Sequence, residues 1–405
     1  YIFDSIQTTE NNLMPSGKMF EQAGIDLVIS EVVSIDRKEK SCSLKNGERI
    51  GYTKLVLATG SNPTVPSWLK GTRLENVFTV PKDKVYLDAM QEKLKGQKRV
   101  IVIGGGFIGV ELSDELKKSG KEVTLVEKLP HILALAFDED IAVRIEALLT
   151  GRGVVLKTGI GAQEIVGDTK VNGVLLDNGE TLQADAVVLS IGYRPESRLA
   201  SEAGLSVSAG GFIPVDEYMR TEDPDIFAVG DCAEKHDFFT RKPNPVMLAS
   251  TACAEARTAG INLFKLSAVK TFSGTISIFA TAIGDTAFGV AGLTELRARE
   301  EGFEIVTGTF EGMDKHPGTL PGTQKQLIKL IFARESGIIL GGEVIGGLSA
   351  GEITNTIGFI IQNRMSINAI LTSQIGTHPL LTASPAGYPL MKAAGIAARK
   401  RIGLL

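Results

Sequence analysis

Gly104, Gly106 and Gly109 form the pattern G-x-G-x-x-G, whose spacing suits the binding of a dinucleotide. The first glycine permits a tight turn, the second lets the backbone approach a pyrophosphate, and the third lets a helix pack closely on the preceding strand. Glu127 lies 18 residues after Gly109, where an acidic side chain accepts hydrogen bonds from a ribose hydroxyl. Because this acid repels a 2′-phosphate, the pattern predicts a site that favours NADH over NADPH.

The segments around these glycines supply the elements that must position them. Val100–Ile103 is a short apolar run rich in β-branched residues, which is typical of a buried parallel strand. Apolar residues then recur every four positions on one helical face, at Ile108, Leu112 and Leu116. A second strand is expected at Glu122–Glu127. This complete series favours a dinucleotide site over a purely structural glycine turn, although glycine loops are common.

A second candidate site lies in the stretch TEDPDIFAVGDCAE, where a short buried strand, Ile226–Val229, is followed by Gly230 and Asp231. A carboxylate at the carboxyl end of a parallel strand lies where open α/β sheets bind ligands, and it could accept a hydrogen bond from a sugar-like chain. Pro245–Leu263 reads as a helix, whose amino end could stabilise negative charge on a bound ring. The residues expected at this site are Gly230, Asp231, Leu248 and Ala249.

Part of the chain is predicted to be a duplicated unit. LKNGERIGYTKLVLATGSNP, residues 44–63, and LDNGETLQADAVVLSIGYRP, residues 176–195, share eight identities in twenty positions at an offset of 132. Upstream, GIDLV at Gly24 and GVVLK at Gly153 also correspond. By this alignment the first unit's glycine loop falls before Tyr1, so we expect the chain to begin inside that unit. The alternative is that both segments are generic β-hairpins, since Asn-Gly turns between apolar strands are common.

The composition is that of an ordinary soluble globular protein. A length of 405 residues allows two or three domains, and a formal net charge of −4 gives no indication of nucleic-acid binding. No apolar run approaches the ~18 residues of a membrane helix, so we expect no membrane partner and a cytoplasmic location. The three cysteines, Cys42, Cys232 and Cys253, are widely spaced and indicate neither a disulfide framework nor a metal site. Each is expected to be buried and inert.

From about Lys270 onward the sequence changes character. Strand-like runs are expected at Thr275–Ala280, Glu304–Phe310, Gln326–Ala333 and Ile338–Ile345. Helical stretches are expected at Thr294–Glu301 and Ser349–Asn363. This region therefore reads as an antiparallel sheet with helices.

The order of ATG (residues 58–60), GGGFIG, Gly192 in SIGYRP, and FAVGDCAE resembles the pyridine nucleotide–disulfide oxidoreductases. The most similar branch contains NADH oxidases, NADH peroxidases, coenzyme A-disulfide reductases and persulfide reductases. The resemblance implies an α/β fold with two Rossmann-like nucleotide-binding domains, the NAD domain inserted in the FAD domain, followed by an α+β C-terminal dimerisation domain. The implied bounds are 1–80 and 198–266 for the FAD-binding domain, 81–197 for the NAD-binding domain, and 267–405 for the dimerisation domain.

The resemblance also assigns roles to residues. It implies that Asp231 binds the FAD ribityl chain, that Glu111 helps to place the nicotinamide, and that Phe107 gates the nicotinamide pocket. The implied cofactor contacts are Ala58, Thr59, Gly60, Gly104, Gly106, Phe107, Ile108, Gly109, Glu127, Gly192, Gly230, Asp231, Leu248 and Ala249. His378-Pro379 is similar to the His-Pro of disulfide reductases, which makes His378 a candidate acid–base catalyst. Glu111 and His378 are the two candidate catalytic residues. The position of its usual glutamate partner is Ala383, and the alternative is a polar residue in the dimer interface.

Two parts of the family pattern are not found in the sequence. The FAD pyrophosphate loop is expected ahead of Tyr1, and Tyr1 matches the tyrosine of the G-x-P-Y sequence that follows the family's redox cysteine. None of the three cysteines present fills that place.

The predicted function is hydride transfer from NADH to FAD, followed by electron transfer to a disulfide- or persulfide-type sulfur substrate or to dioxygen, in a homodimer. Two alternatives stay open. One is an NADH-dependent reductase of a small electron-transfer protein such as rubredoxin or ferredoxin, which needs a docking patch. The other is a non-catalytic remnant that binds NAD without flavin.

Overall fold

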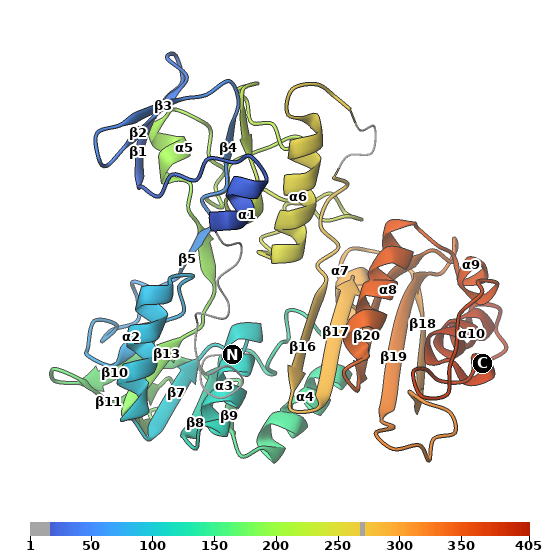
Figure 1. The fold of residues 1–405 in the computed structure, drawn as a ribbon. Coiled ribbons are helices and arrows are strands. Elements are labelled where there is room, and N and C mark those ends of the chain that lie inside the picture. The colour runs from blue at the N-terminus through green and yellow to red at the C-terminus, as the bar shows by residue number, and fades with distance from the viewer. Residues whose placement is uncertain (1–16, 268–271) are drawn as a thin grey trace.

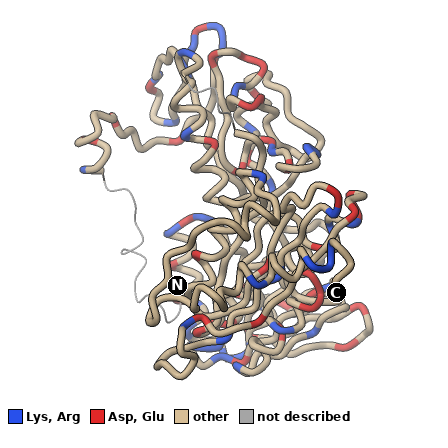
Figure 2. The backbone as a smooth tube through the Cα atoms, turned by 90° about the vertical axis from the view of Figure 1, so that its right-hand side faces the viewer, with Lys and Arg blue, Asp and Glu red and all other residues tan. Residues whose placement is uncertain are grey.

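The computed structural model describes residues 17–267 and 272–405 as three connected units (Figure 1). Two are Rossmann-like α/β units, and the third, at the C-terminal end, is an antiparallel sheet with helices. The predicted fold class is therefore confirmed. Figure 2 shows acidic and basic residues interspersed along the chain. In the described ranges, no helix is both long enough and apolar enough to cross a bilayer.

The central unit is built on a five-stranded parallel sheet in the order β6-β13-β7-β8-β9. Its strands are β6 (Val77–Thr79), β7 (Arg99–Ile103), β8 (Glu122–Glu127), β9 (Val155–Thr158) and β13 (Ala186–Leu189). Helices α2 (Lys84–Lys95), α3 (Phe107–Lys118) and α4 (Glu139–Gly151) pack on one face. The meander β10 (Ala162–Gly167), β11 (Val171–Leu176) and β12 (Thr181–Gln183) covers the other. Because both faces are covered, the central strands β7 and β13 are almost entirely apolar and buried. The predicted strand–loop–helix–strand series is confirmed.

The first unit, drawn at the top of Figure 1, repeats this plan on a smaller scale. It contains a meander of β1 (Val32–Asp36), β2 (Ser41–Leu44) and β3 (Arg49–Gly51), and a parallel pair formed by β4 (Leu55–Leu57) and β15 (Ile226–Ala228). Its helices are α1 (Gly17–Gln22), α5 (Arg198–Glu202), η2 (Gly230–Cys232) and α6 (Ala249–Asn262).

The predicted duplication is confirmed by the backbone. The turn between β2 and β3 and the turn between β11 and β12 use the same hydrogen bonds: Leu44 N–H to Glu48 O and Leu176 N–H to Glu180 O, both 2.8 Å. Gly47 and Gly179 take nearly equal φ angles of +91° and +85°. Each meander is followed by a parallel strand, β4 or β13, so the repeat is larger than a generic hairpin.

The correspondence between GIDLV and GVVLK does not extend to structure. GVVLK contains most of β9, whereas residues 24–30 form no strand and expose apolar side chains, including Leu27, Val28 and Ile29. β9 is held by its parallel pairing with β8. Within the described residues, no strand takes the place of β8 beside residues 24–30, so the local sequence has no ladder to join.

The two repeat units join where their ends pair. β5 (Ser61–Pro63) and β14 (Tyr193–Pro195) form a two-stranded antiparallel ladder. The N–H of Thr64 donates to Gly192 O, and the N–H of Glu196 donates to Gly60 O, both at 2.9 Å. This ladder connects the first unit to the central unit.

The C-terminal unit contains a five-stranded antiparallel sheet in the order β16-β17-β20-β19-β18. Its strands are β16 (Phe279–Ile283), β17 (Thr286–Gly292), β18 (Ile305–Met313), β19 (Lys325–Ala333) and β20 (Ile339–Gly346). Its helices are α7 (Glu295–Glu300), α8 (Ala350–Gln362), α9 (Ile367–Leu371), η3 (Pro385–Gly387) and α10 (Pro389–Arg401). Three of the expected strands and both helices are present within a few residues.

One strand expected in this unit is misplaced and another was missed. The strand expected at Thr275–Ala280 begins only at Phe279, because its hydrogen-bonding partner β17 pairs with residues 279–283. β17 itself, with the sequence TAFGVAG, was missed because its alanines and glycines carry a weak strand signal.

Candidate functional site

The glycine loop has the backbone conformation that its pattern predicts. Gly104 has φ +110°, and a Cβ there would lie 2.5 Å from the carbonyl oxygen of Ser190. A Cβ on Gly109 would lie 1.9 Å from the carbonyl oxygen of Gly104, so helix and loop touch there. Gly106 is exposed, and a Cβ on it would meet nothing within 4 Å. The open position is therefore the one where a pyrophosphate was expected to approach.

The amino end of α3 is available to an anion. Its N-cap residue is Gly106, no side chain caps it, and its first turn contains no acidic residue. The carboxylate of Glu127 lies beside it and accepts hydrogen bonds from the N–H groups of Gly105 (2.5 Å) and Leu129 (2.7 Å). Ile108 is half-buried on the same first turn. Uncapped N–H groups and a fixed carboxylate suit a diphosphate and a ribose, respectively.

Phe107 and Glu111 lie against the C-terminal unit. The ring of Phe107 stacks on Phe279 with centroids 4.7 Å apart and an interplanar angle of 8°. The carboxylate of Glu111 accepts a hydrogen bond of 2.6 Å from the hydroxyl of Thr281. Sequence reasoning missed these two partners, Phe279 and Thr281 on β16. Residues two apart in a strand point to the same face, so the positions 279 and 281 were the signal that could have found them.

Asp231 lies in a small polar cluster at the end of β15. Asp231 is 7% exposed, and its carboxylate accepts a 2.7 Å hydrogen bond from the hydroxyl of Ser61 and forms an ion pair with Lys82. Burial raises the pKa of Asp231, but the Lys82 ammonium and the Ser61 hydroxyl outweigh burial, so the pKa lies below its ordinary value. Lys82 also lies over the ring of Tyr193, 5.7 Å from its centroid. Sequence reasoning missed Ser61 and Lys82.

The helix that follows Asp231 is shorter than expected. α6 begins at Ala249 rather than near Pro245, because Asn244 accepts a hydrogen bond from the N–H of Val246 and starts a turn instead. Leu248 is the N-cap residue, no side chain caps the helix, and its first turn contains no acidic residue. Among the described residues, no side chain caps the first N–H groups of α6, so these groups could face negative charge.

The ATG segment and Gly192 lie at the ladder between the two units. Ala58 is exposed, and the hydroxyl of Thr59 donates to the carbonyl oxygen of Glu196. Gly60 and Gly192 have φ angles of +72° and +97°, which side chains with a Cβ rarely adopt. The duplicated glycines thus begin β5 and β14 in the same way.

His378 lies apart from these residues. His378 is exposed on a loop, and its Nδ1 accepts a hydrogen bond of 3.3 Å from Leu380 N–H. The backbone N–H of His378 donates to the hydroxyl of Thr382. Among the described contacts, none joins His378 to Glu111 or Asp231. Its catalytic role stays a prediction.

The cysteine prediction was wrong at one position. Cys42 and Cys232 are buried, and burial raises the pKa of the Cys42 thiol. Cys253 is exposed on α6, because the buried face of that helix is formed by Thr251, Glu255, Ala259 and Asn262. Tyr1, expected to follow a redox cysteine, lies outside the described residues.

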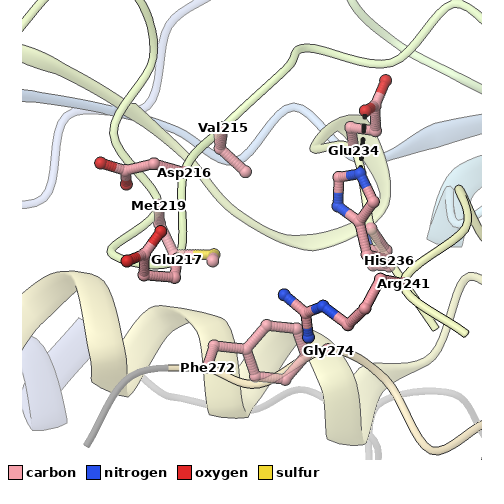
Figure 3. Close-up of a pocket in the computed structure, with 10 residues that line it drawn as sticks. Val215, Asp216, Glu217, Met219, Glu234, His236, Arg241, Phe272 and Gly274 are labelled. Atoms are coloured by element: carbon pink, nitrogen blue, oxygen red, sulfur yellow. Dashed lines mark ion pairs between the residues drawn. The ribbon is translucent and has the colours of Figure 1, made fainter. Parts of the chain in front are cut away.

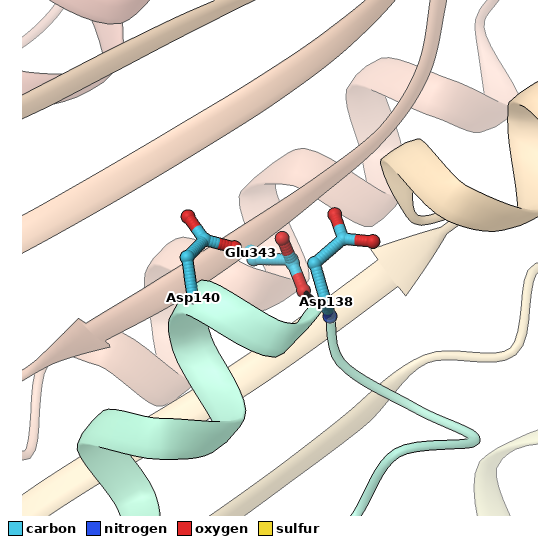
Figure 4. A group of neighbouring side chains, drawn as sticks. All are labelled: Asp138, Asp140 and Glu343. Carbon is cyan, nitrogen blue, oxygen red and sulfur yellow. Dashed lines mark hydrogen bonds between the residues drawn. The ribbon is translucent and has the colours of Figure 1, made fainter.

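An acidic group lies where the central and C-terminal units meet (Figure 4). Asp138, Asp140 and Glu343 bring carboxylate oxygens within 4.8 Å of one another. Lys329 lies among them, with its Nζ 2.8 Å from Asp138, 3.0 Å from Asp140 and 3.5 Å from Glu343. The lysine ammonium supplies the positive charge that a metal ion would otherwise provide.

A polar pocket lies beside the segment that follows Asp231 (Figure 3). Asp216 and Glu217 stand on one side, and Glu234, His236 and Arg241 stand on the other. The Nε2 of His236 lies 3.6 Å from a carboxylate oxygen of Glu234. No cofactor residue predicted from the sequence lines this pocket.

Comparison with known proteins agrees with this geometry. Residues 6–256 match the family described as pyridine nucleotide-disulphide oxidoreductase, and residues 278–386 match its dimerisation domain. An NADH oxidase of Enterococcus faecalis is 33% identical over 357 residues, which cover 86% of this chain and 78% of that protein.

Two solved structures are also similar. A NAD-dependent persulfide reductase from A. fulgidus has a TM-score of 0.89 at 29% identity, covering 97% of this chain and 72% of the other. A water-forming NADH oxidase from Lactobacillus brevis, bound to NADH, has a TM-score of 0.88 at 27% identity, covering 98% and 88%. The chain therefore belongs to the pyridine nucleotide-disulphide oxidoreductase family.

Proposed function

We propose that this protein is an FAD-dependent oxidoreductase that takes a hydride from NADH and delivers electrons to a disulfide- or persulfide-type sulfur substrate or to dioxygen. Membership of the family supports the oxidoreductase activity, and relatives named NADH oxidase and persulfide reductase support these two classes of acceptor.

The observation that carries the proposal is the pairing of β5 with β14. This ladder fixes the Asp231 cluster, through Ser61 at the start of β5, to the unit that holds the glycine loop. On the other strand, Tyr193 donates a hydrogen bond to the carbonyl oxygen of Val80, in the segment that leads to Lys82. This pairing supports the proposal, because it would hold the two proposed nucleotide sites in a fixed relation, as transfer between two cofactors requires.

The described residues fit NADH, and they fit the ribityl chain and ring of FAD. For NADH, the uncapped end of α3 would hold the pyrophosphate, and Glu127 would accept hydrogen bonds from the ribose. For FAD, the carboxylate of Asp231 would accept a hydrogen bond from the ribityl chain, and the uncapped end of α6 would face the electron-rich part of the ring.

Bound FAD would supply the hydride chemistry. The chain's own residues would orient the reactants and exclude water. Phe107 is fixed by its stacking on Phe279, so it can cover the nicotinamide pocket, while Glu111, held by Thr281, can position the nicotinamide. We propose that His378 of one subunit acts at the flavin site of the second subunit. Its loop is exposed and lies in the region that matches the dimerisation domain. A homodimer and a cytoplasmic location complete the proposal.

The experiment that tests the function is an absorbance spectrum of the purified chain before and after anaerobic NADH. We expect a flavin spectrum that bleaches with NADH and recovers on addition of a coenzyme A persulfide, a disulfide or dioxygen. Recovery only with a small electron-transfer protein would favour that class of reductase instead. Absence of flavin, with retained NADH binding, would overturn the proposal in favour of a NAD-binding remnant.

A further inference from the structure

A buried ion pair makes hydrogen bonds to the backbone of the turn that contains Asp231. Lys235 and Glu255 have side-chain exposures of 0% each, and the Nζ of Lys235 lies 3.6 Å from Oε1 of Glu255. Neither residue belongs to the site predicted from the sequence. Their contacts, however, are with the peptide groups on either side of Asp231.

The two side chains hold the Gly230 peptide groups from opposite ends. Oε2 of Glu255 accepts a 2.7 Å hydrogen bond from the N–H of Gly230. The Nζ of Lys235 donates to the carbonyl oxygens of Gly230 and of Ala233, the latter at 3.0 Å. Gly230 has φ +76°, a backbone conformation that glycine adopts readily and other residues rarely do, and Asp231 is the next residue.

Burying the Lys235–Glu255 pair carries a desolvation penalty, so the pair is a poor means of stabilising the fold. Two ionisable side chains are withdrawn from water, and Oε1 of Glu255 has no hydrogen-bond partner among the residues that the structure describes. Apolar side chains of similar volume commonly fill such positions at no loss of stability. A requirement for a fixed turn therefore explains the pair better than packing does.

We propose that Lys235 and Glu255 are positioning residues that set the orientation of the Asp231 carboxylate for flavin binding. The inference rests on the proposed function, in which Asp231 binds the ribityl chain. Lys235 and Glu255 touch no cofactor themselves; they act through the Gly230 peptide.

The charge state of the pair adds a second readout. Burial raises the pKa of Glu255 to about 7, against the opposing effects of Lys235 and the Gly230 N–H, while the Asp231 carboxylate adds to the rise. Lys235 and Asp231 are the charged groups that act on Glu255. The hydrogen bond between Gly230 N–H and Glu255 is therefore expected to change in strength near neutral pH. The affinity for FAD is expected to change with it.

The test is titration of the full-length, flavin-stripped chain with FAD, followed by flavin fluorescence, at pH 6 and pH 8. We expect Lys235→Met and Glu255→Ala to weaken FAD binding about tenfold and to shift the flavin absorption bands. Glu255→Gln keeps an acceptor for Gly230 N–H and mimics the protonated glutamate, so we expect it to have the wild type's pH 6 affinity at both pH values. Cys253→Ser, on the exposed face of the same helix, is the matched control and should bind FAD as the wild type does.

The outcomes separate the two proposals. Lys235→Met and Glu255→Ala that melt at lower temperature but bind FAD normally would overturn the positioning role while leaving the proposed function intact, provided that Asp231→Ala loses FAD. A wild-type chain that binds no FAD, or an Asp231→Ala variant that binds it normally, would overturn both. If Glu255→Ala does not fold, a Glu255→Gln variant that retains the wild-type pH dependence would decide against the inference.

Discussion

Two glycines of the loop differ in whether a Cβ atom could be added to them. Gly106 and Gly109 belong to one pattern, yet their surroundings differ: a Cβ on Gly109 would lie 1.9 Å from a backbone oxygen, while one on Gly106 would meet open space. Gly106 also has φ −74°, which any residue adopts. The pattern therefore combines a glycine needed for folding with one whose open surroundings suit the approach of a ligand.

Substitution should separate these two roles. Gly109→Ala forces α3 away from the loop, so we expect a loss of about 2 kcal/mol or more of unfolding free energy. Gly106→Ala should melt like the wild type but weaken NADH binding about tenfold or more, because the methyl group occupies the approach of the pyrophosphate. Denaturant titration and NADH fluorescence measure the two effects. Equal losses of stability in both variants would contradict this assignment.

Glu255 predicts a pH dependence of stability. Its folded-state pKa of about 7 lies above the ordinary value of 4.5, so the folded chain holds this proton more tightly than the unfolded chain. The associated stability is fully present below pH 4.5 and is lost as the pH rises through 7. Relative to Glu255→Gln, the wild type should lose up to about 1.4 kcal/mol per pH unit in this window. Parallel curves for the two chains, from denaturant titrations between pH 4.5 and pH 8, would contradict the prediction.

At the scale of elements, Lys329 on β19 links the start of α4 to the C-terminal sheet through ion pairs. Asp138, the N-cap residue of α4, accepts hydrogen bonds from the N–H groups of Glu295 and Leu296 at the start of α7. Glu343 on β20 accepts one from the N–H of Asp138 at 2.7 Å. Lys329 on β19 is 4% exposed and forms ion pairs with Asp138, Asp140, Glu295 and Glu343.

The electrostatics of this junction depend on Lys329. Burial tends to lower the pKa of Lys329, but the surrounding carboxylates outweigh it and raise the pKa. Burial, together with Asp138, raises the pKa of Glu343 well above its ordinary value. For Asp138, burial opposes ionisation, yet the contacts with Lys329 and the α7 N–H groups hold its pKa below the ordinary value.

Removing this lysine should loosen the junction. Lys329→Met leaves buried carboxylates without a counter-charge, so we expect a loss of about 3–5 kcal/mol of unfolding free energy. Lys325→Met, on the same strand, removes a lysine whose side chain is 74% exposed and should change stability by less than about 1 kcal/mol. Denaturant unfolding of both variants makes the comparison. Similar small losses would mean that the cluster contributes little.

For the whole molecule, the C-terminal unit carries large apolar side chains in contact with solvent. Phe359 on α8 is 66% exposed and Leu381, near His378, is 72% exposed. The match to the dimerisation domain covers both residues. Such exposure suits burial in a dimer interface.

Charge placed on this unit should therefore break the dimer. We expect Phe359→Glu combined with Leu381→Glu to elute as a monomer, by light scattering after size exclusion, and to lose steady-state activity if His378 serves a partner's flavin. Val85→Glu is the matched control, because Val85 is 80% exposed on α2 of the central unit. A double variant that stays dimeric would place the interface elsewhere.

The sequence by itself determined the local features of this protein. The glycine loop, the strands before and after it and the repeated Asn-Gly turns were predicted because each depends on φ preferences or on periodicity within about twenty residues. The β4–β15 pair, in contrast, joins segments about 170 residues apart, and the correspondence of GIDLV with GVVLK did not extend to a strand because residues 24–30 have no neighbouring strand.

The tertiary structure alone decided the partners of each candidate residue. Lys82 and Ser61 reach Asp231 from 149 and 170 residues away, and Thr281 reaches Glu111 across 170. Even the Glu255 contact with Gly230, only 25 residues distant, depends on how α6 packs against the turn. No local spacing encodes such contacts, because they form only when separate elements bury their apolar faces together and bring the polar groups between them into reach.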